Sequence, residues 1–266
     1  MKLSMKLKSI TLNTFLWLLW RDIRALRTTF IKLWIDYVFS LGVIVVLNNY
    51  VMTKFGLPAN YGVHMLIGQG VAGIIWLVFQ DLNVLAYDLQ GPKAISYELT
   101  LPITYRLVYL RYICIGVIKA VLIILSTLPV CALLIARDID VKSISPFKFL
   151  GVYILAAVLI SFFSMFLTVI FKKAESLNSF WMRWGMAIWM FSGLYTPWYV
   201  MAKAAMWAGY LTLFNPLLYA FEATHAAFMG QAQFINIWLC VIAMIGFSVL
   251  FAYCGMYLFK KRLDCV

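Results

Sequence analysis

The sequence predicts an all-α integral membrane protein, and three observations carry that prediction. Hydrophobic residues make up 65% of the 266 positions and charged residues only 12%, whereas soluble domains are about half apolar and about a quarter charged. The apolar residues gather in runs of about 20, the length that crosses a bilayer as a helix. These runs lack the two-residue alternation of a transmembrane β-strand, so we expect helices rather than a barrel.

The first element expected is an amphipathic helix on the membrane surface at residues 9–31. Its apolar residues recur at three- and four-residue steps, and its arginines fall mostly off that stripe. Trp17 and Trp20 suit the headgroup boundary. We therefore predict an interfacial helix here, separate from the spans that follow.

Six membrane-spanning helices are expected to follow, within a single transmembrane domain that covers residues 1–266. The predicted spans are 34–53, 62–86, 107–135, 147–171, 181–200 and 234–259. An even number of spans places both ends of the chain on the same side of the membrane.

The distribution of Lys and Arg predicts which side that is. Most of the 22 basic residues lie in the leader, in the tail, and in the segments after the second and fourth predicted spans. Basic residues collect on the cytoplasmic side, so both termini are expected in the cytoplasm. The same rule, together with anionic headgroups, accounts for the net charge of +12 without a nucleic-acid partner.

The sequence carries no recognisable catalytic or metal-binding motif. His64 and His225 are far apart and have no metal-ligand spacing around them. No phosphate-binding lysine loop, serine elbow or pair of spaced carboxylates occurs, and the ten acidic residues are spread along the chain. We therefore expect no metal and no cofactor in this chain.

The segment at residues 86–112, AYDLQGPKAISYELTLPITYRLVYLRY, connects the second and third predicted spans on the cytoplasmic side. Residues 93–101 form a candidate short helix, which Pro102 stops before the third span begins near Arg106. A short, partly apolar helix at this surface fits a groove on a soluble partner. A plain interfacial connector fits the same pattern.

Residues 197–230, between the last two predicted spans, are too apolar for a solvated loop. They are also broken too often by proline and glycine to form one span. A helical hairpin that dips into the outer leaflet and returns satisfies both facts. Asn215 is expected to cap its second helix, with Pro216 at the first helical position.

Both segments resemble ABC-2-type ABC transporter permeases, the transmembrane subunits of a class of exporter. In that family an acidic residue precedes a short "LL-xx-P" stretch and a basic residue opens the third span. The matching residues are Glu98, Leu101, Pro102 and Arg106. The family's re-entrant segment typically holds an "NP…Y…E" stretch, matched by Asn215, Pro216, Tyr219 and Glu222. Where the family often has an arginine after this glutamate, the chain has His225 and Ala226.

The resemblance implies an interface helix at 9–31, a cytoplasmic coupling helix at 92–104 and a re-entrant hairpin at 197–230. It implies membrane lipids, soluble ATPase subunits that bind the ATP, and a second permease chain, in a homodimer or a heterodimer. It implies export of a glycan, a lipid-linked molecule or an amphipathic hydrophobic molecule across the cytoplasmic (inner) membrane of a bacterium. This chain would then be a transport subunit and no enzyme.

Asp81 and Lys119 are charged residues expected at membrane depth in the second and third spans. A charge at mid-bilayer costs about 2.5–3.5 kcal/mol, so a mutual ion pair would lessen the cost. Two separate charges that reach the interface or a watery vestibule are the other interpretation. These residues leave open a stand-alone ion-coupled carrier. A few cytoplasmic carboxylates leave open an integral-membrane enzyme acting on lipid-linked substrates.

Overall fold

The computed structural model describes residues 2–58, 60–90, 97–98, 100–140, 144–171 and 173–264. Within these ranges every regular element is a helix, as the sequence predicts, and there is no strand.

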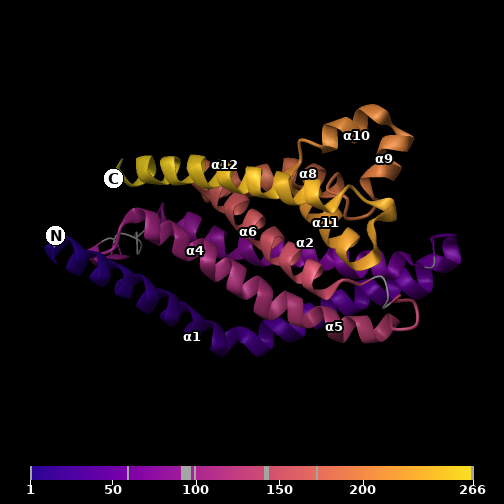
Figure 1. The fold of residues 1–266 in the computed structure, drawn as a ribbon, viewed down its shortest axis with the longest axis horizontal. Coiled ribbons are helices and arrows are strands. Elements are labelled where there is room, and N and C mark those ends of the chain that lie inside the picture. The colour runs from indigo at the N-terminus through magenta and orange to yellow at the C-terminus, as the bar shows by residue number, and fades with distance from the viewer. Residues whose placement is uncertain are drawn as a thin grey trace.

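The helices follow one another along the chain as labelled in Figure 1. They are α1 (Lys2–Val46), α2 (Tyr61–Asp88), α4 (Tyr105–Lys119), α5 (Ser126–Ala132), α6 (Pro146–Ile170), α7 (Ala174–Phe180), α8 (Met186–Met190), α9 (Trp198–Ala204), α10 (Met206–Thr212), α11 (Pro216–Met229) and α12 (Ile237–Asp264). Short π-helical or 3-10 turns extend or join them at Leu47–Val51, Met52–Phe55, Ala120–Leu125, Leu133–Ile135, Trp181–Gly185 and Gln231–Gln233.

Among the described residues, five helical stretches are long and apolar enough to cross a membrane. They are Thr11–Phe55, Tyr61–Asp88, Tyr105–Ile135, Pro146–Ile170 and Ile237–Leu263. The last four agree with predicted spans to within a few residues. The chain therefore has the character of a multi-pass membrane protein.

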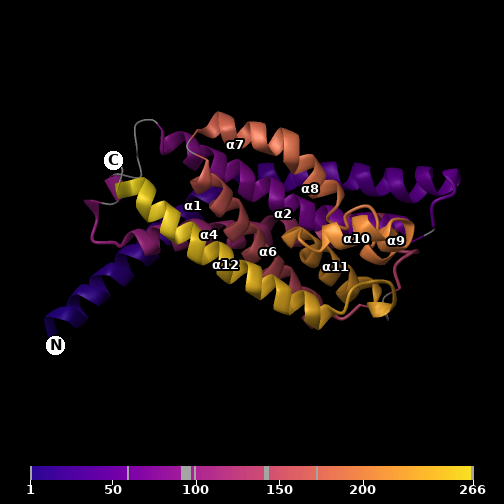
Figure 2. The ribbon, with the colours of Figure 1, turned by 90° about the horizontal axis from the view of Figure 1, so that it is seen from above.

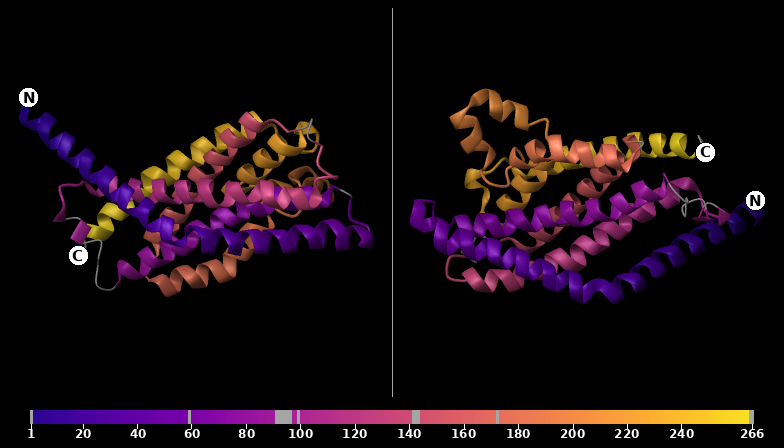
Figure 3. Two further views of the ribbon diagram at one scale, coloured as in Figure 1. Left: turned by 90° about the horizontal axis from the view of Figure 1, so that it is seen from below. Right: turned by 180° about the vertical axis from the view of Figure 1, so that it is seen from behind.

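The first helix is longer than the sequence pattern indicates. A boundary is expected between the interfacial helix at 9–31 and the span at 34–53, but α1 continues through it without a break. The reason lies in the composition, because the first glycine is Gly42 and the first proline is Pro58. No residue near the expected boundary can stop a helix. The helix bends instead, and its N-terminal arm leans away from the bundle (Figures 1 and 3).

The predicted span at 181–200 is divided in the structure. A helix made of α7, the π-helical turn and α8 covers residues 174–190, and is about 26 Å long. That length is less than the hydrocarbon core of about 30 Å. The helix ends at a turn where Gly193 has φ +84°, a conformation that glycine adopts without strain. Pro197 then precedes α9.

Helices α2 and α6 occupy the centre of the bundle. In the most apolar 18-residue stretch of each helix, 83% of the residues are buried in α2 and 67% in α6. The corresponding shares are 11% in the α1 stretch and 22% in α12. The outer helices expose large apolar side chains such as Trp17, Phe39 and Tyr253. A surface of this kind is suited to lipid rather than water.

Both termini lie at the same end of the bundle, which we call the termini end (Figures 1 and 2). The ends of α2 and α6 and the starts of α4 and α7 lie there too (Figures 1 and 2). The opposite end, called the far end, holds the turn after α1, the loop after α5 and the α9–α11 arm. At the termini end Arg262 Nη1 donates to the carbonyl oxygens of Thr168 and Phe171, each at 2.8 Å. These bonds join α12 to carbonyls at the end of α6.

Candidate functional site

A cluster of charged side chains joins three segments at the termini end. We call it the charge cluster and define it as Arg21 and Asp22 of α1, Glu98, and Arg111 of α4. Arg111 Nη1 donates to Glu98 Oε1 at 2.7 Å, and Arg111 Nε lies 3.3 Å from Asp22 Oδ2. Arg21 Nη2 donates to the same glutamate oxygen at 3.0 Å and to Asp22 Oδ1 at 3.1 Å. Two carboxylates are thus held between two guanidinium groups.

Most of the charge cluster is out of contact with solvent. The Arg111 side chain is 4% exposed and that of Glu98 11%, whereas Arg21 is half exposed. Buried charges persist only when they are paired and hydrogen-bonded. The planar fork of arginine can bridge two carboxylates, which lysine cannot do as well. Arg111 therefore holds the segment around Glu98 and the α1 helix together.

The position of Arg111 follows from the local structure of α4. The helix begins at Tyr105, after Thr104 in extended conformation, which places Arg111 in its second turn. The guanidinium carbon lies 4.8 Å from the centre of the Tyr112 ring, a distance typical of a cation–π contact. Asp22 reaches Arg111 because α1 packs against α4.

The four residues of the coupling-helix pattern lie in different surroundings. Glu98 is buried in the charge cluster, and Leu101 packs partly buried against the core. Pro102 is exposed. Arg106 is exposed too, and its Nε donates to the hydroxyl of Tyr105 at 3.2 Å. Of the predicted coupling helix, 92–104, residues 92–96 and 99 lie outside the described residues.

Glu98 therefore pairs with Arg111 and Arg21, whereas Arg106 bonds to Tyr105. Arg106 lies at the start of α4, where the resemblance expects a basic residue, and the sequence pattern does not indicate the contacts of Arg21, Asp22 and Arg111. The available signal was Arg111 itself, because an arginine within a membrane-spanning stretch is costly without a partner.

Asp81 and Lys119 are brought together by the packing of α2 and α4. Lys119 Nζ donates to Asp81 Oδ2 at 2.6 Å, and their side chains are 19% and 38% exposed. The pair lines a cavity of about 450 Å³ between α1, α2 and α4, which Asp22 and Arg111 also line. One cavity thus touches both the ion pair and the charge cluster.

At the far end, Glu222 acts on backbone groups rather than on a cation. Its Oε1 accepts from the N–H of Trp198 at 2.6 Å and its Oε2 from the N–H of Ile235 at 2.9 Å. Glu222 is only 1% exposed. Glu222 therefore fixes the start of α9 and the turn before α12 onto α11.

Asn215 caps α11 as predicted, with Pro216 at the first turn. Its Oδ1 accepts from the N–H of Leu217 at 3.1 Å. Its Nδ2 donates to the carbonyls of Ile188 at 2.6 Å and Phe191 at 3.2 Å, which belong to the end of α8. Tyr219 then donates its hydroxyl to the carbonyl of Leu213 at 2.8 Å. The four residues of the "NP…Y…E" stretch thus shape the α9–α11 arm.

Glu222→Gln is expected to loosen the arm by about 1–2 kcal/mol. The amide keeps the size of the side chain but replaces one acceptor oxygen with a donor, so that Trp198 or Ile235 loses its partner. Amide hydrogen exchange at 198 and 235 should rise about 5- to 30-fold. The control is Glu175→Gln on α7, where the side chain is exposed. Equal amide exchange rates at 198 and 235 in the two variants would contradict the role of Glu222 in fixing α9 and the turn before α12 onto α11.

His64 and His225, far apart in sequence, stack with ring centres 4.0 Å apart and planes at 10°. The two ring nitrogens of His225 lie 2.8 Å and 2.9 Å from the carbonyl oxygens of Phe221 and His64. Among the residues that the structure describes, no group of three or more metal-ligating side chains forms. The pair joins α2 to α11, a packing role that the sequence did not indicate.

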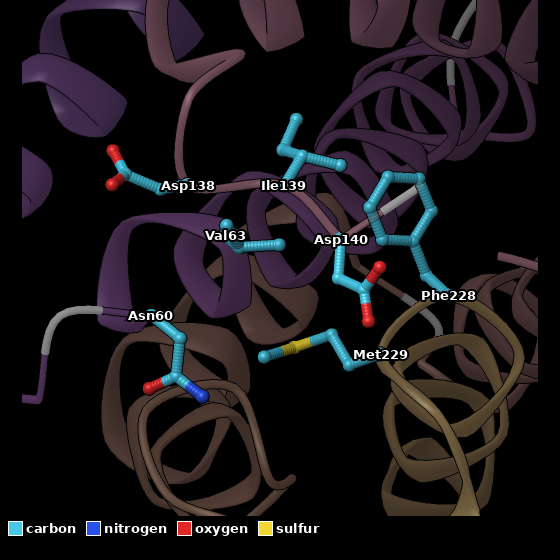
Figure 4. Close-up of a pocket in the computed structure, with 7 residues that line it drawn as sticks. All are labelled: Asn60, Val63, Asp138, Ile139, Asp140, Phe228 and Met229. Atoms are coloured by element: carbon cyan, nitrogen blue, oxygen red, sulfur yellow. The ribbon is translucent and has the colours of Figure 1, made fainter. Parts of the chain in front are cut away.

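A small pocket of about 110 Å³ lies at the far end, between the start of α2, the loop after α5 and the end of α11. Figure 4 shows that the carboxylates of Asp138 and Asp140 point in different directions. Asp138 accepts from Asn49 Nδ2 at 2.8 Å, which ties the end of α1 to that loop. The two carboxylates do not converge on one position where they could hold a ligand together. We therefore interpret this pocket as a gap where helix ends and a loop meet.

Comparison with known proteins gives no family for this chain. No protein-family model matches the sequence, and no curated protein matches it either.

Proposed function

We propose that the chain is the transmembrane permease subunit of an ATP-driven exporter of the ABC-2 type. It would work as a homodimer, or beside a similar second chain, above soluble ATPase subunits that bind and hydrolyse the ATP. The proposed location is the cytoplasmic membrane of a bacterium, with both termini in the cytoplasm. The proposed cargo is a glycan, a lipid-linked molecule or an amphipathic hydrophobic molecule.

The charge cluster is the observation that supports this proposal most. An exporter without its own ATPase needs a cytoplasmic segment that receives a displacement and passes it to membrane helices. Glu98 belongs to such a segment, and its side chain is bonded to α4 through Arg111 and to α1 through Arg21. Displacing Glu98 would therefore displace two long apolar helices at once.

The arrangement of the chain supports six crossings. Both termini lie at the termini end (Figure 1), as expected for an even number of passes. We assign the sixth to the helix at 174–190 together with the α9–α11 arm, since that helix alone is about 26 Å long. In this assignment residues 197–230 form the re-entrant hairpin of the outer leaflet, and α11 brings the chain back to α12.

The proposed mechanism runs from the ATPases to the far end. Closure of the ATPase subunits on ATP would move the segment around Glu98, and the charge cluster would carry that movement into α1 and α4. The cargo path between the two permease chains would then open outward. ATP can shift this equilibrium only if the ATPases contact the segment differently in the two states. Arg21, half exposed, is the member of the cluster best placed to exchange partners.

Glu98→Gln is expected to lower cargo-stimulated ATP hydrolysis of the complex about tenfold, because it weakens the link to α1 and α4. Pro102→Ala should act in the same direction. The measurement uses the complex purified from native membranes by a tag on this chain, with Glu175→Gln as an exposed control at the same end. If no ATPase copurifies, or if folded Glu98→Gln hydrolyses ATP normally, the proposal fails.

A stand-alone ion-coupled carrier is the second candidate, favoured by the Asp81–Lys119 pair beside its cavity. Cargo movement by the purified chain in ATP-free vesicles, driven by an imposed proton gradient and abolished in Asp81→Asn, would establish this candidate instead.

A further inference from the structure

We propose that the cavity between α1, α2 and α4 binds the headgroup of a zwitterionic phospholipid that carries a primary amine. Its phosphate would bond to Lys119 and Arg111, and its ammonium group to Asp81 and Asp22. This inference goes beyond the proposed function and does not depend on an ATPase partner.

The charge composition of the cavity favours a zwitterion. The charged residues of the lining are two cations and two anions: Arg111, Lys119, Asp22 and Asp81. A ligand of one sign would leave charges of that same sign facing it, which costs energy at low dielectric constant. A ligand with one positive and one negative group can exchange partners with the ion pairs without leaving any charge unmatched.

Unused donors in the cavity favour a phosphate. Arg111 Nε forms an ion pair with Asp22 Oδ2 at 3.3 Å but makes no hydrogen bond to any described residue. Lys119 Nζ carries three donors and makes one side-chain hydrogen bond to Asp81. Phosphate oxygens accept several hydrogen bonds at once and bind arginine and lysine strongly. A buried donor that makes no hydrogen bond is costly.

The volume and the opening of the cavity favour a lipid headgroup. At about 450 Å³, the cavity lies within the usual range of ligand sites, about 300–1,000 Å³. Part of its lining is exposed: Ala25, Thr28 and Thr29 on α1, and Val84 on α2. Val84 is apolar and 70% exposed. The cavity is therefore open to the outside between α1 and α2, the side from which a lipid headgroup can enter.

The depth of the charges is also appropriate. Asp81 lies seven residues before the end of α2, about 10 Å along the helix axis. The headgroup layer of a bilayer is about 5–8 Å thick on each side. The carboxylate is thus near the inner boundary of that layer, on the leaflet at the termini end.

The first test compares lipids on the unaltered chain. Native mass spectrometry from detergent would be recorded with palmitoyl-oleoyl phosphatidylethanolamine, phosphatidylcholine and phosphatidylglycerol at equal concentration. We expect the ethanolamine lipid to be retained about tenfold more than the others, a difference of about 1.4 kcal/mol. The choline group cannot donate a hydrogen bond to Asp81, and phosphatidylglycerol has no cation. Equal retention of the three lipids would overturn the proposal.

A second arm separates the membrane source from a soluble one. O-phosphoethanolamine has the same headgroup without acyl chains. At equal concentration it should leave the bound ethanolamine lipid in place, because the acyl chains contribute to binding. Displacement at equal concentration would identify a soluble ligand and overturn the lipid assignment.

Variants then place the headgroup in this cavity. Lys119→Met and Asp81→Asn should each lower retention of the ethanolamine lipid about tenfold. Lys148→Met on α6 and Asp36→Asn on α1 are matched controls, exposed and outside the cavity lining, and should not change retention. Unchanged retention in both cavity variants would overturn the site. The comparison of lipids on the unaltered chain remains decisive if a variant fails to fold.

Discussion

Arg111→Met is expected to destabilise the folded chain by about 3–5 kcal/mol, the usual cost of removing one partner from a buried ion pair. Without the guanidinium group, Asp22 loses its α4 partner and Glu98 keeps only Arg21, whose side chain is 54% exposed. The expected fall in melting temperature in detergent is about 6–20 °C. Arg111→Lys should recover only part of the loss, because an ammonium group cannot bridge two carboxylates in the same way.

Arg106→Met is the matched control for that measurement. Arg106 lies on the same helix, carries the same charge and is exposed, so its removal should change stability by no more than about 0.5 kcal/mol. Combining Arg111→Met with Asp22→Asn and Glu98→Gln should restore part of the stability, since the buried carboxylates are then neutral. Similar melting temperatures for the two single arginine variants would contradict the role of the charge cluster in holding α1, α4 and the segment around Glu98 together.

Gly255→Ala has the second-largest effect that we expect, a loss of about 2–3 kcal/mol from overpacking. Helix α12 crosses α4 at this glycine, and an added Cβ would overlap the hydroxyl oxygen of Tyr109 and lie 3.2 Å from Cζ of its ring. Tyr109 is fully buried, so the ring has little room to move. The melting temperature should fall by about 4–12 °C.

The same helix supplies the control for Gly255. A Cβ at Gly246 would meet nothing within 4 Å, so Gly246→Ala should be neutral or should stabilise the helix by up to about 1 kcal/mol. Tyr109→Phe removes the overlapping oxygen, a buried hydroxyl without a hydrogen-bond partner in the described part of the chain. In the Tyr109→Phe background the cost of Gly255→Ala should shrink. An undiminished cost there would show that the overlap is not the cause.

Hydrophobicity and length were enough to predict most of the fold. The run 147–171 is almost entirely apolar after Lys148, and Pro146 at the start of α6 marks the boundary. The pattern of α1 was harder to interpret, because amphipathicity indicates which face is polar but not where a helix stops. The prediction of one continuous span at 181–200 missed a break in the helix for a related reason. Averaged hydropathy does not register one turn at Gly193, although that turn divides the apolar run.

The candidate site was less predictable, because its contacts join positions far apart in sequence. Asn215 and Pro216 were placed correctly, since a cap depends only on the residues that follow it. Arg21 meets Glu98 across 77 positions, and which face of α4 turns toward α1 depends on packing. The partners of Glu222 are backbone N–H groups, and any residue except proline supplies these, so the sequence does not identify them.

The side-chain amide of Asn215 restricts which residues can replace it. This one side chain donates hydrogen bonds to the carbonyls at the end of α8 and accepts a hydrogen bond from a backbone N–H in the first turn of α11. Aspartate can only accept when ionised, and serine is too short to serve both helix ends at once. Replacement of Asn215 by either residue is therefore expected to uncouple the end of α8 from the start of α11.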